Sequence, residues 1–161
     1  MGRAGNLALG LAVIFGTAWT GCAESLGSPE TEATTTSGVA LMNLEGREDD
    51  PFESSQARAI VFLFIRTDCP VSNRYAPEVR SLFDNYRDQG VDFWLVYPDP
   101  DVTVEAIENH LEEYRYPLPA LRDPRFTLVD LTGVTITPEV AVFVPGLELV
   151  YRGRIDDRYV D

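Results

Sequence analysis

The chain has 161 residues, of which 45% are hydrophobic, so it is long enough for one folded domain with a single core. Its 26 acidic and 13 basic residues give a formal net charge of -13, which repels nucleic acid phosphates and argues against DNA or RNA as a partner. With two cysteines, one histidine and no calcium-loop spacing of acidic residues, the sequence predicts neither a metal site nor another cofactor.

Residues 1–22 have the pattern of an export signal. A short positive start precedes an apolar run of 12 residues, Leu7–Ala18, which is shorter than the roughly 20 residues that span a bilayer. The ending Gly21-Cys22 resembles a bacterial lipobox, although Trp19 stands where Leu is usual. We therefore predict lipidation at Cys22. Ordinary signal-peptidase cleavage near Ala23 and a buried N-terminal helix are the alternatives.

Residues 23–37 are predicted to form a flexible tether. They are rich in Ser, Thr, Glu and Gly and poor in large apolar side chains, so burial cannot offset the entropy lost on ordering them. The folded domain is then expected to span residues 38–161. A lipid-anchored domain needs a tether of this kind between anchor and fold.

The first half of the domain predicts strand, strand, helix. Residues 39–44 read as an edge strand or hairpin arm, and the continuous apolar run 59–65 is typical of a central strand buried on both faces. Residues 71–88 carry an apolar stripe at helical spacing, and Pro77 inside it predicts a kink or a late regular start. Gly90 ends this helix.

The second half adds alternating strands and helices. Residues 91–97 predict a strand, and residues 103–114 predict a helix with Ile107, Leu111 and Tyr114 on one face. The remaining expectations are a proline-rich loop with room for a short strand at 116–124, a short helix at 126–131, and a hairpin of 139–144 and 148–152. The order predicts an α/β fold, a mixed sheet flanked by helices.

Cys69 is the candidate reactive group. It lies between a predicted strand and a predicted helix, where free backbone N–H groups and the helix dipole favour the thiolate. Pro70 suits the first helical position because it has no N–H. Arg66 and Arg74 would add positive potential and Asp68 would oppose it, and the sequence does not decide which dominates.

Several short stretches resemble the thioredoxin superfamily. Cys69-Pro-Val-Ser72 is similar to the thioredoxin active-site turn, Pro77 matches its helix-kinking proline, and Thr137-Pro138 resembles the cis-proline loop that faces the active cysteine. The stretches 68–77, 137–140 and 151–157 are similar to redoxins of the alkyl hydroperoxide reductase/thiol-specific antioxidant family. This resemblance implies a thioredoxin-like fold over residues 38–161, with Cys69, Ser72, Thr137 and Pro138 at the site.

The departures from these families define the functional alternatives. Ser72 stands where a dithiol thioredoxin has its second cysteine, so the mature protein cannot form an internal CxxC disulfide. Phe62 and Arg66 occupy the places of the Pro and Thr in the peroxiredoxin motif. The chain also stops soon after the hairpin, where thioredoxins add a helix, so that C-terminal helix is expected to be absent.

The resulting prediction is a one-cysteine thiol-disulfide oxidoreductase, exported to the bacterial envelope or periplasm and lipid-anchored there. Its partners would be a protein or small-molecule disulfide and an external thiol reductant. The alternatives are a thiol peroxidase and a catalytically silent binding module.

Ser72 is equally consistent with a plain helix-start hydroxyl and with a hydrogen-bond donor to Cys69. His110 is assigned to the polar-to-boundary side of its helix, with a structural or solvated role, and Trp94 to the core.

Overall fold

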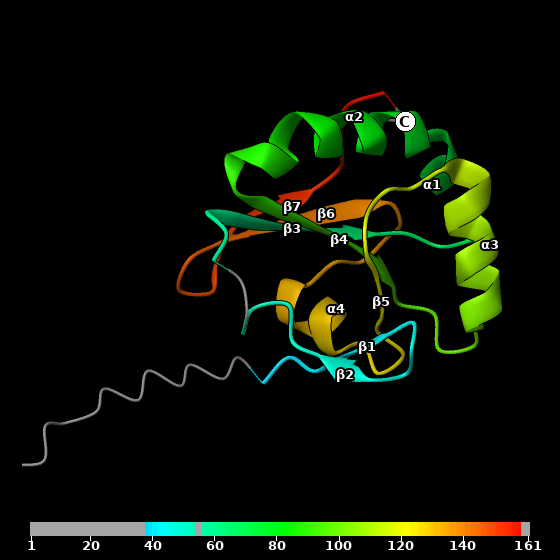
Figure 1. Cartoon of the computed structure of the whole chain (residues 1–161), viewed down its shortest axis with the longest axis horizontal. Helices are drawn as coiled ribbons and strands as arrows, with labels where there is room; N and C mark the ends of the chain where they lie inside the picture. Colours follow the sequence, from blue (N-terminus) through cyan, green and yellow to red (C-terminus); the bar gives the residue numbers. More distant parts are fainter. Residues whose placement is uncertain (1–37, 54–55, 159–161) are drawn as a thin grey trace, which may run out of the picture. The chain divides into compact units, whose positions relative to one another are not determined.

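The computed structural model describes residues 38–53 and 56–158, which contain one seven-stranded mixed sheet (Figure 1). The strand order is β2-β1-β5-β4-β3-β6-β7, with β3, β4 and β5 parallel and the other pairings antiparallel. The strands are β1 (Leu41–Asn43), β2 (Glu48–Asp49), β3 (Ala59–Phe64), β4 (Val91–Tyr97), β5 (Ala120–Arg122), β6 (Glu139–Val144) and β7 (Glu148–Gly153). The predicted mixed α/β sheet is confirmed. The predicted signal and tether, residues 1–37, lie outside the described residues.

Strands β3 and β4 form the centre of the sheet because β3 is continuously apolar and β4 is apolar from Phe93 to Tyr97. They pair in parallel, with Phe62 opposite Trp94 and Leu63 opposite Leu95. Alternate residues face opposite sides of a strand, so Leu63 and Leu95 join one buried cluster, while Phe62 joins the other. Trp94 is half-buried against the second cluster, which agrees with its assignment to the core.

The predicted helix over residues 71–88 is divided into two. Helix α1 (Pro70–Arg74) ends at Tyr75, and α2 (Ala76–Tyr86) starts directly afterwards, followed by a 3-10 turn, Arg87–Gln89. Pro77 lies in the first turn of α2, where its missing N–H leaves no helical bond unmade. The break that Pro77 predicts is therefore confirmed, one turn after Cys69.

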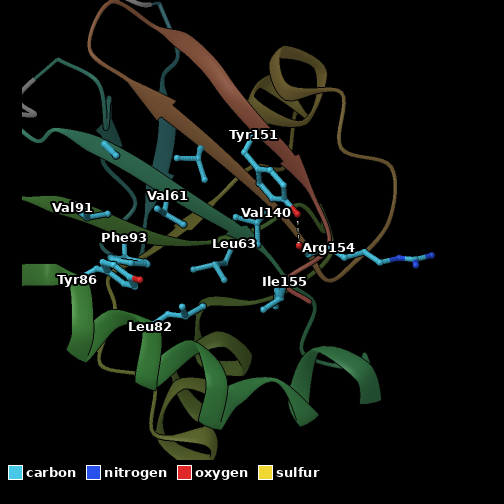
Figure 2. A pocket seen from close by; sticks show the side chains of 12 residues that line it. Val61, Leu63, Leu82, Tyr86, Val91, Phe93, Val140, Tyr151, Arg154 and Ile155 are labelled. Atoms are coloured by element: carbon cyan, nitrogen blue, oxygen red, sulfur yellow. Dashed lines mark hydrogen bonds between the residues drawn. The ribbon is translucent and has the colours of Figure 1, made fainter. Parts of the chain in front are cut away.

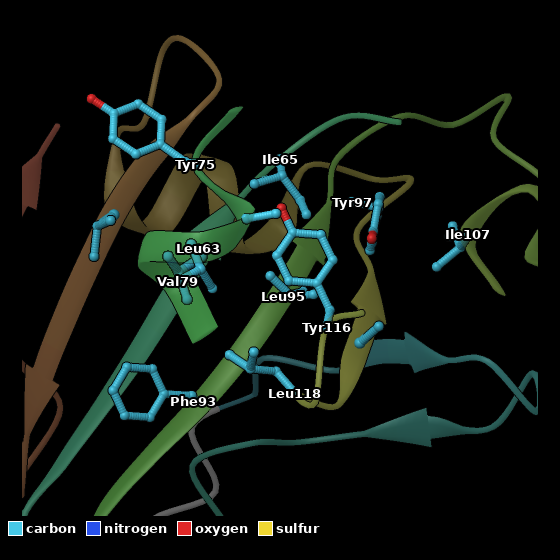
Figure 3. Packing of buried hydrophobic residues seen from close by; sticks show 13 residues of the cluster. Leu63, Ile65, Tyr75, Val79, Phe93, Leu95, Tyr97, Ile107, Tyr116 and Leu118 are labelled. Atoms are coloured by element: carbon cyan, nitrogen blue, oxygen red, sulfur yellow. The ribbon is translucent and has the colours of Figure 1, made fainter. Parts of the chain in front are cut away.

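Helices cover both faces of the sheet (Figure 1). Val79 of α2 and Ile107 of α3 (Val104–Tyr114) are fully buried in the first cluster, which Figure 3 shows from close by. Leu128 of α4 (Thr127–Thr132) is fully buried in the second cluster, on the opposite face. Cys69 follows the carboxyl end of β3, and its sulfur contacts both the first turn of α1 and Thr137 in the loop before β6.

Two short strands complete the sheet. β2 pairs with β1 as a hairpin, which is one of the two alternatives given for residues 39–44, although the sequence did not place its second strand. β5 is the short strand allowed for in the loop 116–124. β6 and β7 form the predicted hairpin around Pro145-Gly146, with a register shift between Val142 and Phe143. Among the described residues, no helix is long and apolar enough to span a membrane.

Candidate functional site

Cys69 occupies the N-cap position of α1, directly after the loop that leaves β3. Its backbone is extended, with φ -88° and ψ 108°, and Pro70 follows at the first helical position. The Ser72 N–H, which has no partner within the helix, points at the Cys69 sulfur with a donor–acceptor distance of 3.5 Å. Cys69 therefore lies at a strand-to-helix junction, as predicted, and a backbone N–H donates to its Sγ.

The thiol is half-buried, and its surroundings favour the ionised form. Partial burial is the largest single influence and raises the pKa of Cys69, but hydrogen bonds from Ser72, the Val71 N–H and Thr137 together outweigh it. The net result is a Cys69 pKa below the ordinary thiol value. In the protonated form, Sγ–H donates to the Thr137 carbonyl at 3.5 Å.

Ser72 contributes through both its backbone and its side chain. Its Oγ is buried and makes no hydrogen bond of ordinary geometry among the described residues. The hydroxyl nevertheless lowers the pKa of Cys69, as does the Ser72 N–H. The two interpretations of the Ser72 hydroxyl that the sequence left open, a helix-start hydroxyl and a hydrogen-bond donor to Cys69, therefore both stay predictions.

Arg66 resolves the competition between charges that the sequence left undecided. Its guanidinium bonds Asp68 through Nε, at 3.0 Å to Oδ1, and Asp99 through Nη2, at 2.9 Å. The hydrogen bond from Arg66 lowers the Asp68 pKa, so this carboxylate stays ionised but neutralised beside the thiol. Arg74 is exposed and makes no ion pair within the described part of the chain.

The Thr137-Pro138 segment lies against Cys69, as the resemblance to the thioredoxin loop implied. The peptide bond between these two residues is cis, and Pro138 is buried. Glu139 fastens the preceding loop, because its Oε2 accepts the N–H groups of Thr135 at 2.7 Å and Ile136 at 3.2 Å. The structure thus brings Cys69, Ser72, Thr137 and Pro138 together at one end of the sheet.

His110 is a site neighbour that the sequence prediction placed on the wrong side of its helix. It is only 4% exposed and bonds Tyr97 and Asn73. The sequence spacing indicates the buried side, because His110 is three residues after the buried Ile107 and four before Tyr114, on the same face of the helix. The imidazole is buried there because Tyr97 and Asn73 satisfy both of its ring nitrogens.

Several hollows lie on the surface of the described residues, and one of them is lined by Thr137, whose carbonyl contacts the Cys69 sulfur. A groove of about 270 Å³ runs from Arg66 to Thr137 and is lined on its apolar side by Phe126 and Ile136. A more apolar groove of about 320 Å³, shown in Figure 2, lies between α2 and β7 and does not reach Cys69. Within residues 38–53 and 56–158, no group of three or more His, Cys, Asp or Glu side chains is placed to hold a metal ion.

Comparison with known families identifies the chain. The profile of the AhpC/TSA family matches residues 37–152, which is most of the chain and includes the whole site. The chain belongs to the AhpC/TSA family. No curated protein sequence gives a significant match.

Solved structures show that this AhpC/TSA member has a thioredoxin-like fold. An uncharacterized conserved protein from Geobacillus kaustophilus is 28% identical, with a TM-score of 0.66 over 73% of this chain and 66% of that one. A thiol-disulfide oxidoreductase from Bacteroides fragilis is 16% identical, with a TM-score of 0.63 over 72% and 87%. A secreted Mycobacterium tuberculosis disulfide oxidoreductase is 19% identical, with a TM-score of 0.57 over 69% and 79%. The chain therefore spans just under two thirds of the Geobacillus protein.

Proposed function

We propose that this AhpC/TSA-family chain is a thiol-disulfide oxidoreductase that reacts through Cys69 alone. The observation that carries the proposal is the Cys69 sulfur at the N-cap of α1, receiving the Ser72 N–H and partly open to solvent. A thiolate is the attacking species in disulfide exchange, and hydrogen bonds that lower the pKa of Cys69 raise its thiolate fraction near neutral pH.

The reaction has two exchange steps. The Cys69 thiolate attacks one sulfur of a substrate disulfide, the S–S bond breaks, and the other sulfur leaves as a thiolate that takes a proton from water. Because position 72 is Ser, the mixed disulfide on Cys69 has no second thiol of a CxxC pair to resolve it. An external thiolate then attacks the substrate sulfur of that mixed disulfide, forms a new disulfide with it, and releases Cys69 as the thiolate.

Thr137 and Pro138 would orient the substrate chain in this scheme. The Thr137 carbonyl lies 3.5 Å from Sγ, so backbone groups of this loop are next to the reacting atom. Arg66 would keep the carboxylates of Asp68 and Asp99 from raising the Cys69 pKa. No metal or other cofactor enters these steps.

The test compares the wild-type full chain with Cys69→Ser and with Cys22→Ser as a matched cysteine control. Rates of insulin reduction with an external thiol and of mixed-disulfide trapping should be abolished by Cys69→Ser and kept by Cys22→Ser. Equal rates in all three proteins would remove the proposal. Stopped-flow peroxide consumption faster than that of free cysteine would replace it with a thiol peroxidase, and an unreactive Cys69 would leave a binding module.

We also propose that the chain acts in the bacterial envelope on a lipid anchor. The support is the leader with its 12-residue apolar run, followed by Gly21-Cys22 and the polar tether 23–37. A secreted disulfide oxidoreductase among the structures of the same fold is consistent with this location. Labelled palmitate supplied to bacteria expressing the full chain should enter the protein and should be lost in Cys22→Ser. Equal labelling of the two would contradict lipidation at Cys22.

A further inference from the structure

His110 is a buried titratable side chain that the proposed chemistry does not use. It lies on α3, packed between the rings of Tyr114 and Tyr116 at centroid distances of 4.8 and 5.6 Å. Its Nδ1 is 2.8 Å from the Tyr97 hydroxyl, and its Nε2 is 2.8 Å from Asn73 Oδ1. Both ring nitrogens are thus engaged, one by the core strand β4 and one by the helix that follows Cys69.

The partners fix the direction of each hydrogen bond. Asn73 Nδ2 donates to the Thr67 carbonyl at 3.3 Å, so Asn73 Oδ1 is the acceptor that faces the imidazole. His110 Nε2–H therefore donates to Asn73, and in a neutral ring Nδ1 accepts from the Tyr97 hydroxyl. Burial lowers the pKa of His110, against an opposing effect of Glu113, and this agrees with the neutral ring.

Asn73 connects this imidazole to the reactive turn. Its side chain holds the Thr67 carbonyl, and its backbone N–H donates to the Cys69 carbonyl at 3.1 Å. These two carbonyls flank Asp68, so Asn73 ties together the loop before Cys69 and the first turn of α1. The same first turn supplies the Ser72 N–H to Sγ. A displacement of Asn73 would move that donor relative to the sulfur.

We propose that His110 is a positioning residue, which holds Asn73 through Nε2–H and so fixes the first turn of α1 against the Cys69 sulfur. The inference rests on the proposed function insofar as it concerns the reactivity of Cys69. Without the His110 donor, the half-buried Asn73 Oδ1 loses its protein partner, and the Asn73 side chain shifts toward solvent and takes the turn with it. The Cys69 thiolate then loses part of its hydrogen bonding, and its pKa rises.

Two nearly isosteric substitutions separate this role from general packing. The amide nitrogen of Gln reaches the position of Nε2, so His110→Gln keeps the donor to Asn73 and loses the bond with Tyr97. The amide of Asn reaches only the position of Nδ1, so His110→Asn keeps the Tyr97 side and loses the donor to Asn73. Tyr97→Phe is the control that removes the Tyr97 bond alone, and Asn73→Ala removes the proposed link from its other end.

The experiment measures the pH dependence of Cys69 alkylation in the full chain, followed on the Cys69 peptide by mass spectrometry. We expect alkylation at pH 7 to fall about tenfold in His110→Asn and Asn73→Ala, equivalent to one pKa unit, and to stay within about twofold of wild type in His110→Gln and Tyr97→Phe. Urea unfolding is expected to show similar destabilisation of both His110 variants. Equal alkylation profiles for His110→Asn and His110→Gln would overturn the inference.

A second readout keeps this inference separate from the proposed function. Exchange of the Ser72 and Asn73 backbone amide hydrogens, followed by NMR, should accelerate in His110→Asn and remain near wild type in His110→Gln. An ordinary Cys69 pKa in the wild type would count against the proposed function, while unequal amide exchange in the two variants would still support the positioning role. Equal exchange would remove that role, whatever the reactivity of the thiol.

Discussion

At the scale of single residues, the chemistry of the site depends on which atoms surround one sulfur. Burial of Cys69 alone would hold its pKa high, and the opposite outcome comes from donors supplied by Ser72, Val71 and Thr137. Each donor is short-ranged, so substitutions of one or two atoms next to Cys69 should alter its reactivity without altering the fold.

Ser72→Cys should convert the chain into a dithiol protein. Ser72 Oγ is fully buried without a hydrogen-bond partner among the described residues, and the Ser72 N–H lies 3.5 Å from the Cys69 sulfur, so a thiol at this position replaces no side-chain hydrogen bond and lies within one helical turn of Cys69. We expect mild oxidation to protect both thiols from alkylation through a disulfide between Cys69 and the introduced thiol, and a reductant to restore both. Ser72→Ala, which cannot form that bond, is the control. Persistent alkylation of both thiols after oxidation would show that the sulfurs do not meet.

Arg66→Gln should make Cys69 less reactive. The variant leaves the carboxylates of Asp68 and Asp99 without their shared cation, and their charge disfavours a nearby thiolate. We expect alkylation at pH 7 to slow about threefold, equivalent to half a pKa unit. Arg74→Gln removes an exposed arginine that has no ion pair in the described ranges, and it should leave the rate unchanged. If both variants behave alike, total charge rather than the Arg66 contacts sets the rate.

At the scale of secondary-structure elements, polar side chains fix the first turns of helices. Asp123, only 1% exposed, accepts the N–H groups of Thr127 at 2.7 Å, Leu128 at 2.9 Å and Val129 at 3.0 Å at the start of α4. Thr103 caps α3 in the same manner through Ala106. Each of these side chains satisfies donors that a helix cannot satisfy itself.

Asp123→Asn should destabilise the fold by about 2 to 3 kcal/mol, because three helix N–H groups would share one remaining oxygen and would face an amide donor. The free energy of unfolding in urea measures the loss. Asp130→Asn, an exposed change on the same helix, should stay within about 0.5 kcal/mol of wild type. A similarly small effect of Asp123→Asn would mean that water replaces the carboxylate at this cap.

The junction of α3 with α1 and β4 should make stability depend on pH. Burial lowers the pKa of His110, so below about pH 6.5 the unfolded chain binds a proton that the folded chain excludes. Stability should therefore fall as the pH drops from about 7.5 to about 5.5, by at most about 1.4 kcal/mol for each pH unit, and His110→Gln should reduce that slope. Urea unfolding at several pH values provides the measurement. Identical slopes would indicate that the folded chain protonates His110 as readily as the unfolded one.

The groups that face His110 oppose one another over this range of pH. Glu113 favours the protonated ring, whereas the buried hydroxyls of Tyr97 and Tyr116 keep their protons because burial raises both of their pKa values. Asp68 and Asp156 have lowered pKa values, so the stability that they contribute is present above the ordinary carboxyl range and is lost as the pH falls below it. The His110 effect is thus the one expected near pH 6.

At the scale of the whole molecule, the end of the sheet near Cys69 is fixed by polar contacts, whereas its β7 edge exposes apolar side chains. The end near Cys69 is held together by Tyr75, whose hydroxyl donates to Asp156, and by Arg158, which pairs with Asp156 and Glu78. The stretch 151–157 thus includes an anchor for the segment between α1 and α2. At the lateral edge, by contrast, β7 exposes Leu149, Val150 and Tyr151.

Val150→Lys should reduce self-association with little effect on stability. Val150 is 51% exposed on β7, at one edge of the sheet within the described residues, and a charge there opposes pairing with the edge of another molecule. We expect the unfolding free energy to change by less than about 0.5 kcal/mol and light scattering at high concentration to decrease. Leu131→Lys makes the same kind of change on α4, where Leu131 is 49% exposed, and should have less effect on scattering. A larger decrease in light scattering for Leu131→Lys than for Val150→Lys would indicate that the molecules associate through α4 and not through β7.

Most of the fold was predictable because its signals are local. The continuous apolar run 59–65 became β3, and the predicted strand 91–97 became β4. The alternation of strands and helices became a mixed α/β sheet, and Pro77 marked the break between α1 and α2. The hairpin partner β2 was missed because Glu48-Asp49 has no apolar pattern, and its pairing comes from β1 across a turn. His110 was assigned to the wrong side of its helix although its spacing from Ile107 and Tyr114 indicates the buried stripe, and only the structure shows that Tyr97 and Asn73 satisfy its ring nitrogens.

By itself, the sequence determined that Cys69 lies between a strand and a helix, that Pro70 follows it, and that Ser72 replaces a second thiol. These are properties of neighbouring residues, so local spacing is enough to establish them. Only the tertiary structure decided that Thr137 lies against Sγ, that Arg66 neutralises Asp68 and Asp99, and that His110 reaches Asn73. The physical reason is that hydrogen bonds and ion pairs depend on distances of a few ångströms between residues far apart in the chain, and packing alone sets those distances.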